Sequence, residues 1–233
     1  MSVPGRFDSD VEAGTNLSSQ FPWPTLFSPA PFAFAIWGVI YLGEIAGMAM
    51  IAYDERVATK SRPGAAAWIA ANVCQALWCA SFRPWALNRL WVSTVCLGAT
   101  AICLFFSQTS HDAKCRLLNV PRSLHLGWVT AACLVNLNAW VGMARHGPAL
   151  ALTVAISSVV LAVVIAVAYT LRGLPCASIA VAWALYALSK GEHIGPDAKA
   201  LGQEALEGLA GSEGIAACLI VLVVVAGKAG RGA

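Results

Sequence analysis

Residues 31–53 read PFAFAIWGVIYLGEIAGMAMIAY, and this stretch decides the class of the fold. Glu44 is its only charged residue. A helix that crosses the hydrocarbon core of a bilayer needs about 20 consecutive apolar residues, and this stretch supplies them. Pro31 suits the first turn of a helix, where its missing N–H has no partner to lose. The stretch therefore predicts a transmembrane helix.

The rest of the chain repeats this composition. Of its 233 residues, 58% are hydrophobic and only 12% are charged, about half the charge of a typical soluble domain. The mean hydropathy is +0.69. Lipid admits only helices or closed barrels, and the alternating pattern of barrel strands is absent. We therefore predict an all-α, multi-pass integral membrane protein, a polytopic bundle of about seven transmembrane helices. The predicted spans are 31–53, 65–82, 87–108, 123–144, 149–171, 176–189 and 214–227.

The polar and Pro-rich segments between these spans divide the chain into three predicted regions. Residues 1–30 form a polar, Pro-rich segment without an apolar core, and 31–144 form a membrane region of four helices. Residues 145–233 add further C-terminal membrane helices, with a polar loop at 190–213. Within that loop, 196–209 is a candidate surface helix. Charged or polar loops are also predicted at 54–64 and 109–122.

Several function classes lack their sequence signals. The formal net charge of +3 is scattered, so no basic patch predicts a nucleic-acid partner. The eight cysteines contain no CxxC pair, which favours free thiols over a disulfide framework or a metal site. No nucleophile constellation, Walker loop or metal-binding histidine pair is visible. We therefore expect no catalytic residues, no metal, and no cofactor beyond a bound ligand.

Three of the predicted spans place aromatic and polar side chains on one helical face, because they recur at steps of three or four residues. Polar groups in lipid normally face the interior of the bundle. Converging faces of this kind suit a pocket for a large planar apolar ligand. They equally suit hydrogen bonding between packed helices, and the sequence leaves both interpretations open. The residues are Phe34, Trp37, Tyr41 and Glu44 in the first span, Asn72, Gln75 and Trp78 in the second, and His125, Trp128 and Asn136 in the fourth.

Glu44 is the one acid that the hydropathy pattern places deep in a span. An unpaired carboxylate there costs several kcal/mol, so the side chain must be paired or protonated. Its candidate partners are Asn72, Gln75 and His125. It could contact a ligand, relay a proton, or bond as a neutral acid to a neighbouring helix. Gly43 and Gly47 flank it in a GxxxG pattern, which permits close helix approach.

The order and spacing of these residues resemble the translocator protein / tryptophan-rich sensory protein (TspO/MBR) family over about residues 28–144. In the family, two prolines begin a helix and are followed by an aromatic residue and a W-x-x-L-Y pattern. In later helices a polar residue precedes a Trp by three, and another Trp precedes an Asn by eight. The matching residues are Pro29, Pro31, Phe34, Trp37, Ile40, Tyr41, Gln75, Trp78, Trp128 and Asn136. Gln75 replaces the usual Asn, and Leu124 and His125 replace a Pro-Tyr pair.

The resemblance implies a divergent, longer branch of that family, with a TspO/MBR-like first four helices and extra C-terminal helices. The family pocket binds porphyrins and, in some members, sterols. We therefore expect a non-enzymatic membrane binder or sensor of a planar hydrophobic ligand, porphyrin-like (tetrapyrrole-like) or a sterol. One alternative is a transporter of such a ligand that uses Glu44 in a proton relay. Another is a structural subunit of a larger membrane complex. The expected partners are the ligand, the lipid bilayer, and a second copy or a larger membrane assembly.

Overall fold

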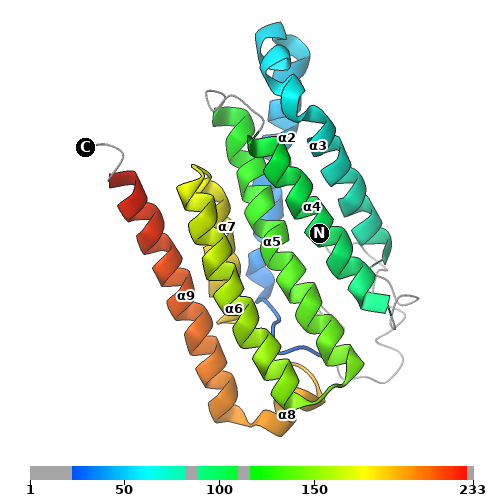
Figure 1. Ribbon diagram of the computed structural model, residues 1–233, viewed down its shortest axis with the longest axis vertical. Helices are drawn as coiled ribbons and strands as arrows, with labels where there is room; N and C mark the ends of the chain where they lie inside the picture. The colour runs from blue at the N-terminus through cyan, green and yellow to red at the C-terminus, as the bar shows by residue number, and fades with distance from the viewer. Residues whose placement is uncertain (1–22, 82–88, 110–115, 230–233) are drawn as a thin grey trace.

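The computed structural model describes residues 23–81, 89–109 and 116–229, and the described part is a bundle of long helices (Figure 1). Most of the predicted N-terminal segment, 1–22, and part of the predicted loop before the fourth span, 110–115, lie outside the described residues. In chain order the elements are η1 (Pro31–Ala35), α2 (Ile36–Tyr53), α3 (Glu55–Ser81), α4 (Leu90–Thr109), α5 (Arg116–Ala144), α6 (Pro148–Leu171), α7 (Pro175–Leu188), α8 (Pro196–Leu201) and α9 (Gln203–Ala229).

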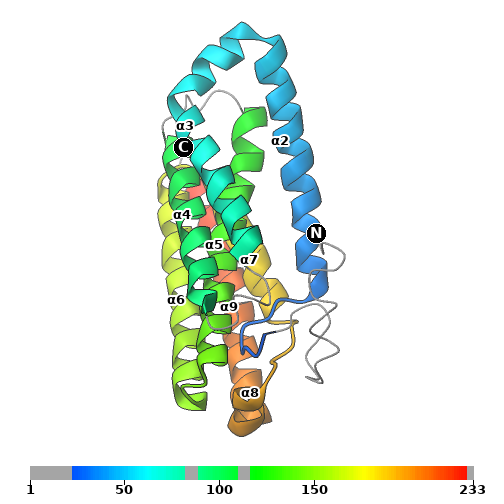
Figure 2. The same ribbon diagram turned by 90° about the vertical axis from the view of Figure 1, so that its right-hand side faces the viewer.

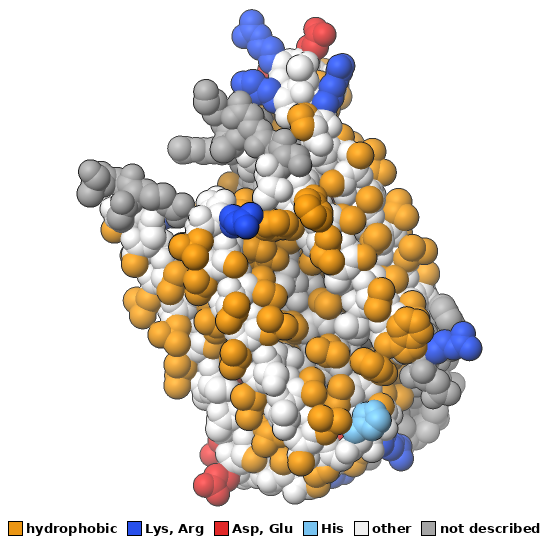
Figure 3. All heavy atoms as spheres, viewed as in Figure 1, with side chains coloured by type: hydrophobic (Ala, Val, Ile, Leu, Met, Phe, Trp, Pro, Cys, Tyr) orange, Lys and Arg blue, Asp and Glu red, His pale blue; other side chains and the backbone are white. Residues whose placement is uncertain are grey.

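The predicted all-α membrane bundle is confirmed. Within the described part of the chain, five helical stretches are long and apolar enough to cross a membrane: Pro31–Tyr53, Leu90–Thr109, Leu118–Ala144, Pro148–Leu171 and Gln203–Ala229. Of the other two predicted spans, α7 is apolar but has only 14 residues, and α3 begins with a charged segment. In Figure 3, hydrophobic side chains cover the flank of the bundle, and the visible charged side chains gather at its two ends. This distribution is that of a protein embedded in lipid.

The helix α5 organises the bundle, because α2, α4, α6 and α7 all pack against it. In Figure 1, α9 forms one edge, α3 and α4 form the other, and α5, α6 and α7 lie between them. Figure 2 shows α2 on the outer face, joined to α3 by the turn at the top. At Gly127 of α5, an added Cβ would collide with the backbone of Ala177 in α7. The absence of a side chain there permits close packing of the two helices.

Three predicted loop boundaries are wrong, because the helices extend beyond the segments that hydropathy marks. The predicted loop at 54–64 belongs mostly to α3, whose first turn is capped by the Asp54 carboxylate; Oδ1 accepts hydrogen bonds from the backbone N–H groups of Arg56 at 2.8 Å and Val57 at 3.4 Å. Similarly, α5 begins at Arg116 rather than at 123. The loop at 190–213 ends near Gly202, whose φ of +78° separates α8 from α9. The candidate surface helix at 196–209 is therefore divided between these two helices.

The last part of the predicted polar N-terminal segment is buried beneath the bundle, which hydropathy did not indicate. Trp23, Leu26 and Phe27 are each no more than 2% exposed. Thr25 exchanges two backbone hydrogen bonds of 2.8 Å with Ile194. Figure 2 shows this segment running below α2 towards α8. Its backbone contacts Gly142 so closely that any Cβ at this position would collide with it.

A second acid lies inside the bundle, so the expectation that Glu44 is alone there is wrong. Glu213 is fully buried in α9. Neither of its carboxyl oxygens has a hydrogen-bond partner among the described residues. Its face is apolar and includes Leu209, Ala216 and Ile220. A charged carboxylate would be costly in these surroundings, so the neutral acid is the favoured form.

Replacing Glu213 with Leu should stabilise the protein. A buried polar group without a partner costs about 1–3 kcal/mol, and Leu has a similar volume without that penalty. We expect Glu213→Leu to raise the free energy of unfolding by about that amount, measured as a higher melting temperature of the purified protein in detergent. The control is Glu207→Leu on the exposed face of the same helix, with a change within about 0.5 kcal/mol. A lower melting temperature for Glu213→Leu would contradict the prediction.

Candidate functional site

The site begins with the close approach of α2 to α5. A Cβ added at Gly43 would collide with the ring of Pro121, and one at Gly47 would come within 2.6 Å of Leu118 Cδ2. The GxxxG pattern of the sequence is therefore a real contact between helices. Glu44 follows Gly43 directly, so the same contact carries its carboxyl group into the interface with α5.

Four polar side chains from three helices form one hydrogen-bonded chain, which we call the polar tetrad: Glu44 and Tyr41 of α2, Gln75 of α3 and His125 of α5. His125 Nδ1 lies 2.8 Å from Glu44 Oε1. His125 Nε2 contacts Gln75 Oε1. Gln75 Nε2 donates to the Tyr41 hydroxyl at 3.1 Å. The His125 side chain is fully buried, and the Glu44 side chain is 8% exposed.

Within the tetrad, the proton of the Glu44–His125 hydrogen bond can reside on either residue. The Gln75 oxygen can only accept, so in this arrangement His125 Nε2 carries a hydrogen. Nδ1 then either accepts a hydrogen bond from the O–H of a neutral Glu44 or, when protonated, donates one to a Glu44 carboxylate. The neutral pair avoids burying two charges in lipid. The two forms differ only in which side of the Glu44–His125 hydrogen bond holds the proton.

A group of aromatic rings adjoins the tetrad, and Trp37 connects the two. It stacks on Tyr41 with ring centroids 4.9 Å apart and an interplanar angle of 12°. Its ring meets His125 at 5.5 Å and 74°, and Trp128 at 6.2 Å and 83°. Phe34 also contacts Trp128, with ring centroids 5.8 Å apart and an interplanar angle of 82°. Trp37 and Trp128 are buried, whereas Phe34 is 36% exposed at the outer edge of the group.

Two of the other predicted site residues form a separate contact. Trp78 Nε1 donates to Asn136 Oδ1 at 3.2 Å, and this bond joins α3 to α5. Asn136 also donates to the carbonyl of Ala132 in its own helix. Asn72 donates its side-chain N–H to the carbonyl of Trp68, also within its own helix. Of the candidate partners of Glu44, the structure therefore selects His125, with Gln75 one step further along the chain.

Sequence reasoning missed several polar contacts outside this group. The Arg122 guanidinium lies 5.1 Å from the ring centroid of Trp68. Trp183 Nε1 donates to the backbone oxygen of Ala33 at 3.1 Å, which ties α7 to η1. Arg122 precedes His125 by three residues, so the helical period could have placed it on the same face. The bond to Ala33 has no such signal, because it joins residues 150 positions apart.

The comparisons with known proteins give one match. A family model described as TSPO-like protein matches residues 11–226. This range includes the tetrad and its aromatic neighbours, and it also includes α6, α7 and nearly all of α9. No curated protein and no solved structure matches the chain significantly.

Substitutions at the α2 glycines should distinguish two effects on the free energy of unfolding: the close packing of α2 on α5, and the low helix propensity of glycine. Gly43→Ala forces a methyl group against the rigid ring of Pro121, and we expect a loss of about 1–3 kcal/mol in unfolding free energy. Gly47→Ala should cost less, because the Leu118 side chain can rotate. Gly38 in the same helix has open space around it, so Gly38→Ala should stabilise by about 0.5–1 kcal/mol. Thermal unfolding in detergent measures all three, and equal effects at Gly38 and Gly43 would contradict the close approach.

Proposed function

This chain belongs to the TSPO-like protein family, and from that premise we propose that it binds a large planar apolar ligand inside the membrane, as a binder or sensor without catalytic activity. The observation that carries the proposal is the group of rings around Trp37, together with the tetrad beside it. Flat aromatic walls with a few hydrogen-bonding groups suit a porphyrin-like ring or a sterol. The tetrad supplies the few polar contacts that would orient such a ligand.

The position of α2 supports entry of the ligand from the lipid. Its outer face is apolar and exposed, with Val39, Leu42 and Ile45 each at least 60% accessible. Phe34 lies at the edge of the ring group and contacts the buried Trp128. A ligand dissolved in the bilayer could therefore reach the rings by displacing Phe34. It would not need to pass through water at either end of the bundle.

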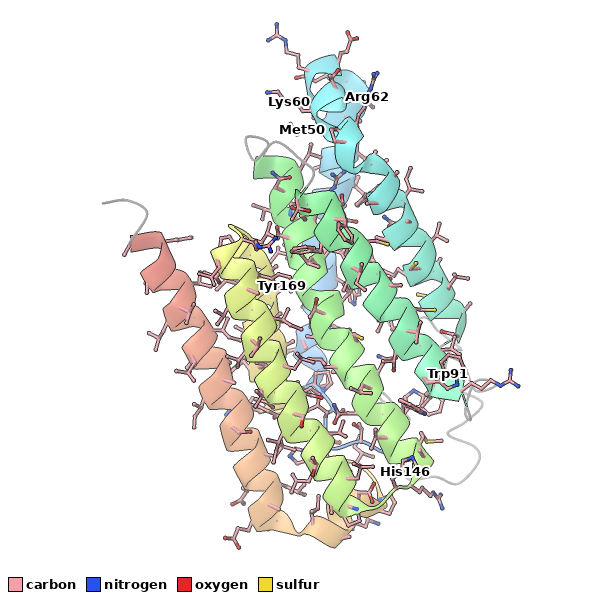
Figure 4. The ribbon with its side chains drawn as sticks, viewed as in Figure 1. Met50, Lys60, Arg62, Trp91, His146 and Tyr169 are labelled. Atoms are coloured by element: carbon pink, nitrogen blue, oxygen red, sulfur yellow. The ribbon has the colours of Figure 1, made fainter. Side chains whose placement is uncertain are left out.

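The rings predict a measurable effect on ligand affinity. Titration with protoporphyrin should quench tryptophan fluorescence, and Trp37→Ala and Trp128→Ala should each weaken binding by about 1–3 kcal/mol, because each removes a buried aromatic surface. Trp91 is 47% exposed and lies near the lower end of α4 (Figure 4), so Trp91→Ala serves as the matched control. Unchanged affinity in both test variants would remove the two rings from the site.

A transporter of the same ligand is the second candidate, and the Glu44–His125 hydrogen bond favours it. A proton that can sit on either partner of a buried pair is what a proton-coupled carrier requires. Transport would also need the pair to open towards each side of the membrane in turn. The binder needs only one arrangement of α2 against α5.

Glu44→Gln distinguishes the two candidates. Glutamine keeps the shape and a hydrogen bond to His125 but cannot release a proton. For a binder, we expect nearly unchanged affinity for protoporphyrin and no uptake into liposomes by either protein. For a carrier, the substitution should abolish pH-dependent uptake while equilibrium binding remains. Glu207→Gln on the surface of α9 is the control. If uptake into liposomes changes neither with pH nor with the Glu44→Gln substitution, a proton relay at this pair is excluded.

A further inference from the structure

The upper ends of α4 and α5, together with the middle of α3, bring together a group of side chains that the proposed site does not use. We call Trp68, Ser107, Gln108 and Arg122 the donor cluster. The helices α3 and α4 run in opposite directions, and Ser81 Oγ lies 3.1 Å from Ser93 Oγ. Fourteen residues further up both helices, Ser107 is therefore level with position 67, beside Trp68. Figure 4 shows that α3 continues above this level to Arg62 and Lys60.

The helix α5 contributes the remaining contacts of the cluster. The Arg122 guanidinium of α5 lies over the Trp68 ring at 5.1 Å. Its neighbour Ser123 donates to Gln108 Oε1 at 3.4 Å. Arg122, Ser107 and Gln108 are all at least nine-tenths buried. Contacts between α5 and each of the other two helices thus hold the cluster in one place.

Three hydrogen-bond donors of this cluster remain without acceptors. Among the described residues, Trp68 Nε1, Ser107 Oγ and Gln108 Nε2 are buried and have no hydrogen-bond partner. Buried polar groups are nearly always paired, so donors left open in this way indicate an acceptor from outside the chain. An indole N–H and an amide NH₂ can only donate. Beside the positive charge of Arg122, they favour an anionic oxygen as the acceptor.

The donor cluster adjoins the proposed ligand site. Arg122 lies three residues before His125 on α5, and Trp68 lies seven residues before Gln75 on α3, so in both helices the cluster is within about two turns of the tetrad. We propose that the planar ligand is an acid, and that its carboxylate accepts hydrogen bonds from Trp68, Ser107 and Gln108. This inference rests on the proposed function and narrows it to one substrate class: planar apolar molecules that bear a carboxylate at their rim.

Protoporphyrin and its dimethyl ester provide the test, because they share the ring and differ in the two carboxylates. Both are titrated against the full-length protein in phosphatidylcholine nanodiscs. We expect the wild-type protein to bind the acid about tenfold more tightly than the ester, as charged hydrogen bonds predict. Trp68→Phe keeps a ring beneath Arg122 and removes only the N–H, and Gln108→Leu removes the amide. Each should reduce the preference for the acid and leave the affinity for the ester unchanged.

The matched control is Thr100→Val in the same helix. Thr100 is also buried, but its hydroxyl is already bonded to the carbonyl of Cys96, so the preference for the acid should persist. Equal binding of acid and ester by the wild-type protein would overturn the inference and leave the proposed function standing. A preference that both test variants retain would also overturn it. Binding of neither compound would defeat the proposed function and this inference with it.

The anionic headgroup of a lipid could accept the same hydrogen bonds as the carboxylate of a planar ligand. A second measurement distinguishes these two acceptors. The melting temperature is compared in nanodiscs of phosphatidylcholine and in nanodiscs with one fifth phosphatidylglycerol. Under the proposal, the two temperatures agree in the wild-type protein and in Trp68→Phe. Stabilisation by phosphatidylglycerol that Trp68→Phe abolishes, together with equal binding of acid and ester, would assign the donors to lipid and overturn the proposal.

Discussion

The contact of α2 with α5 at Gly43 and Gly47 is the constraint on which the candidate site depends. A methyl group at Gly43 would collide with Pro121, and relief of that collision would move α2 outward. The 2.8 Å contact between Glu44 and His125 has no slack for such a movement. The stacked pair of Trp37 and Tyr41 is carried by the same helix, so it would move as well. Two residues without side chains therefore determine the geometry of both the polar and the aromatic parts of the site.

The surrounding lipid explains why the polar groups are so concentrated. Without water, a buried donor or acceptor must find its partner within the protein, or remain at a cost. The tetrad offsets that cost with three interhelical contacts. Among the described residues, the Glu213 carboxyl group and three donors of the cluster, Trp68 Nε1, Ser107 Oγ and Gln108 Nε2, have no such contact. Their surroundings differ: Glu213 stands on an apolar face, whereas the unpaired donors of the cluster stand beside a cation and point to a missing acceptor.

The helical period made most of the candidate site predictable from the sequence. Contacts that join residues far apart in the chain could not be predicted in this way. The steps of three and four residues identified the faces of Trp37, Gln75 and His125, and the tetrad follows once those faces meet. Hydropathy marks the most apolar part of a helix, so it missed the polar N-terminal part of α3 and that of α9, which extends from Gln203 to Glu213. Glu213 was missed for that reason, although it continues the pattern of Leu209, Ala216 and Ile220. Contacts such as Thr25 with Ile194 are distant in the chain and have no local pattern.

The candidate membrane spans differ in how much of each is buried within the bundle. The most apolar stretch is 22% buried in Pro31–Tyr53, 33% buried in α4, α6 and α9, and 67% buried in α5. The rest of the bundle interlocks through small residues such as Ala155, Ala180 and Ala217, and through the close contact of Gly127 with Ala177. Elements with few buried contacts open at the lowest free-energy cost. Among these spans, α2 is therefore the helix that we expect to separate from the bundle most readily. The Glu44–His125 hydrogen bond crosses the contact of α2 with α5, so any such separation would have to break it and leave two buried polar groups without partners.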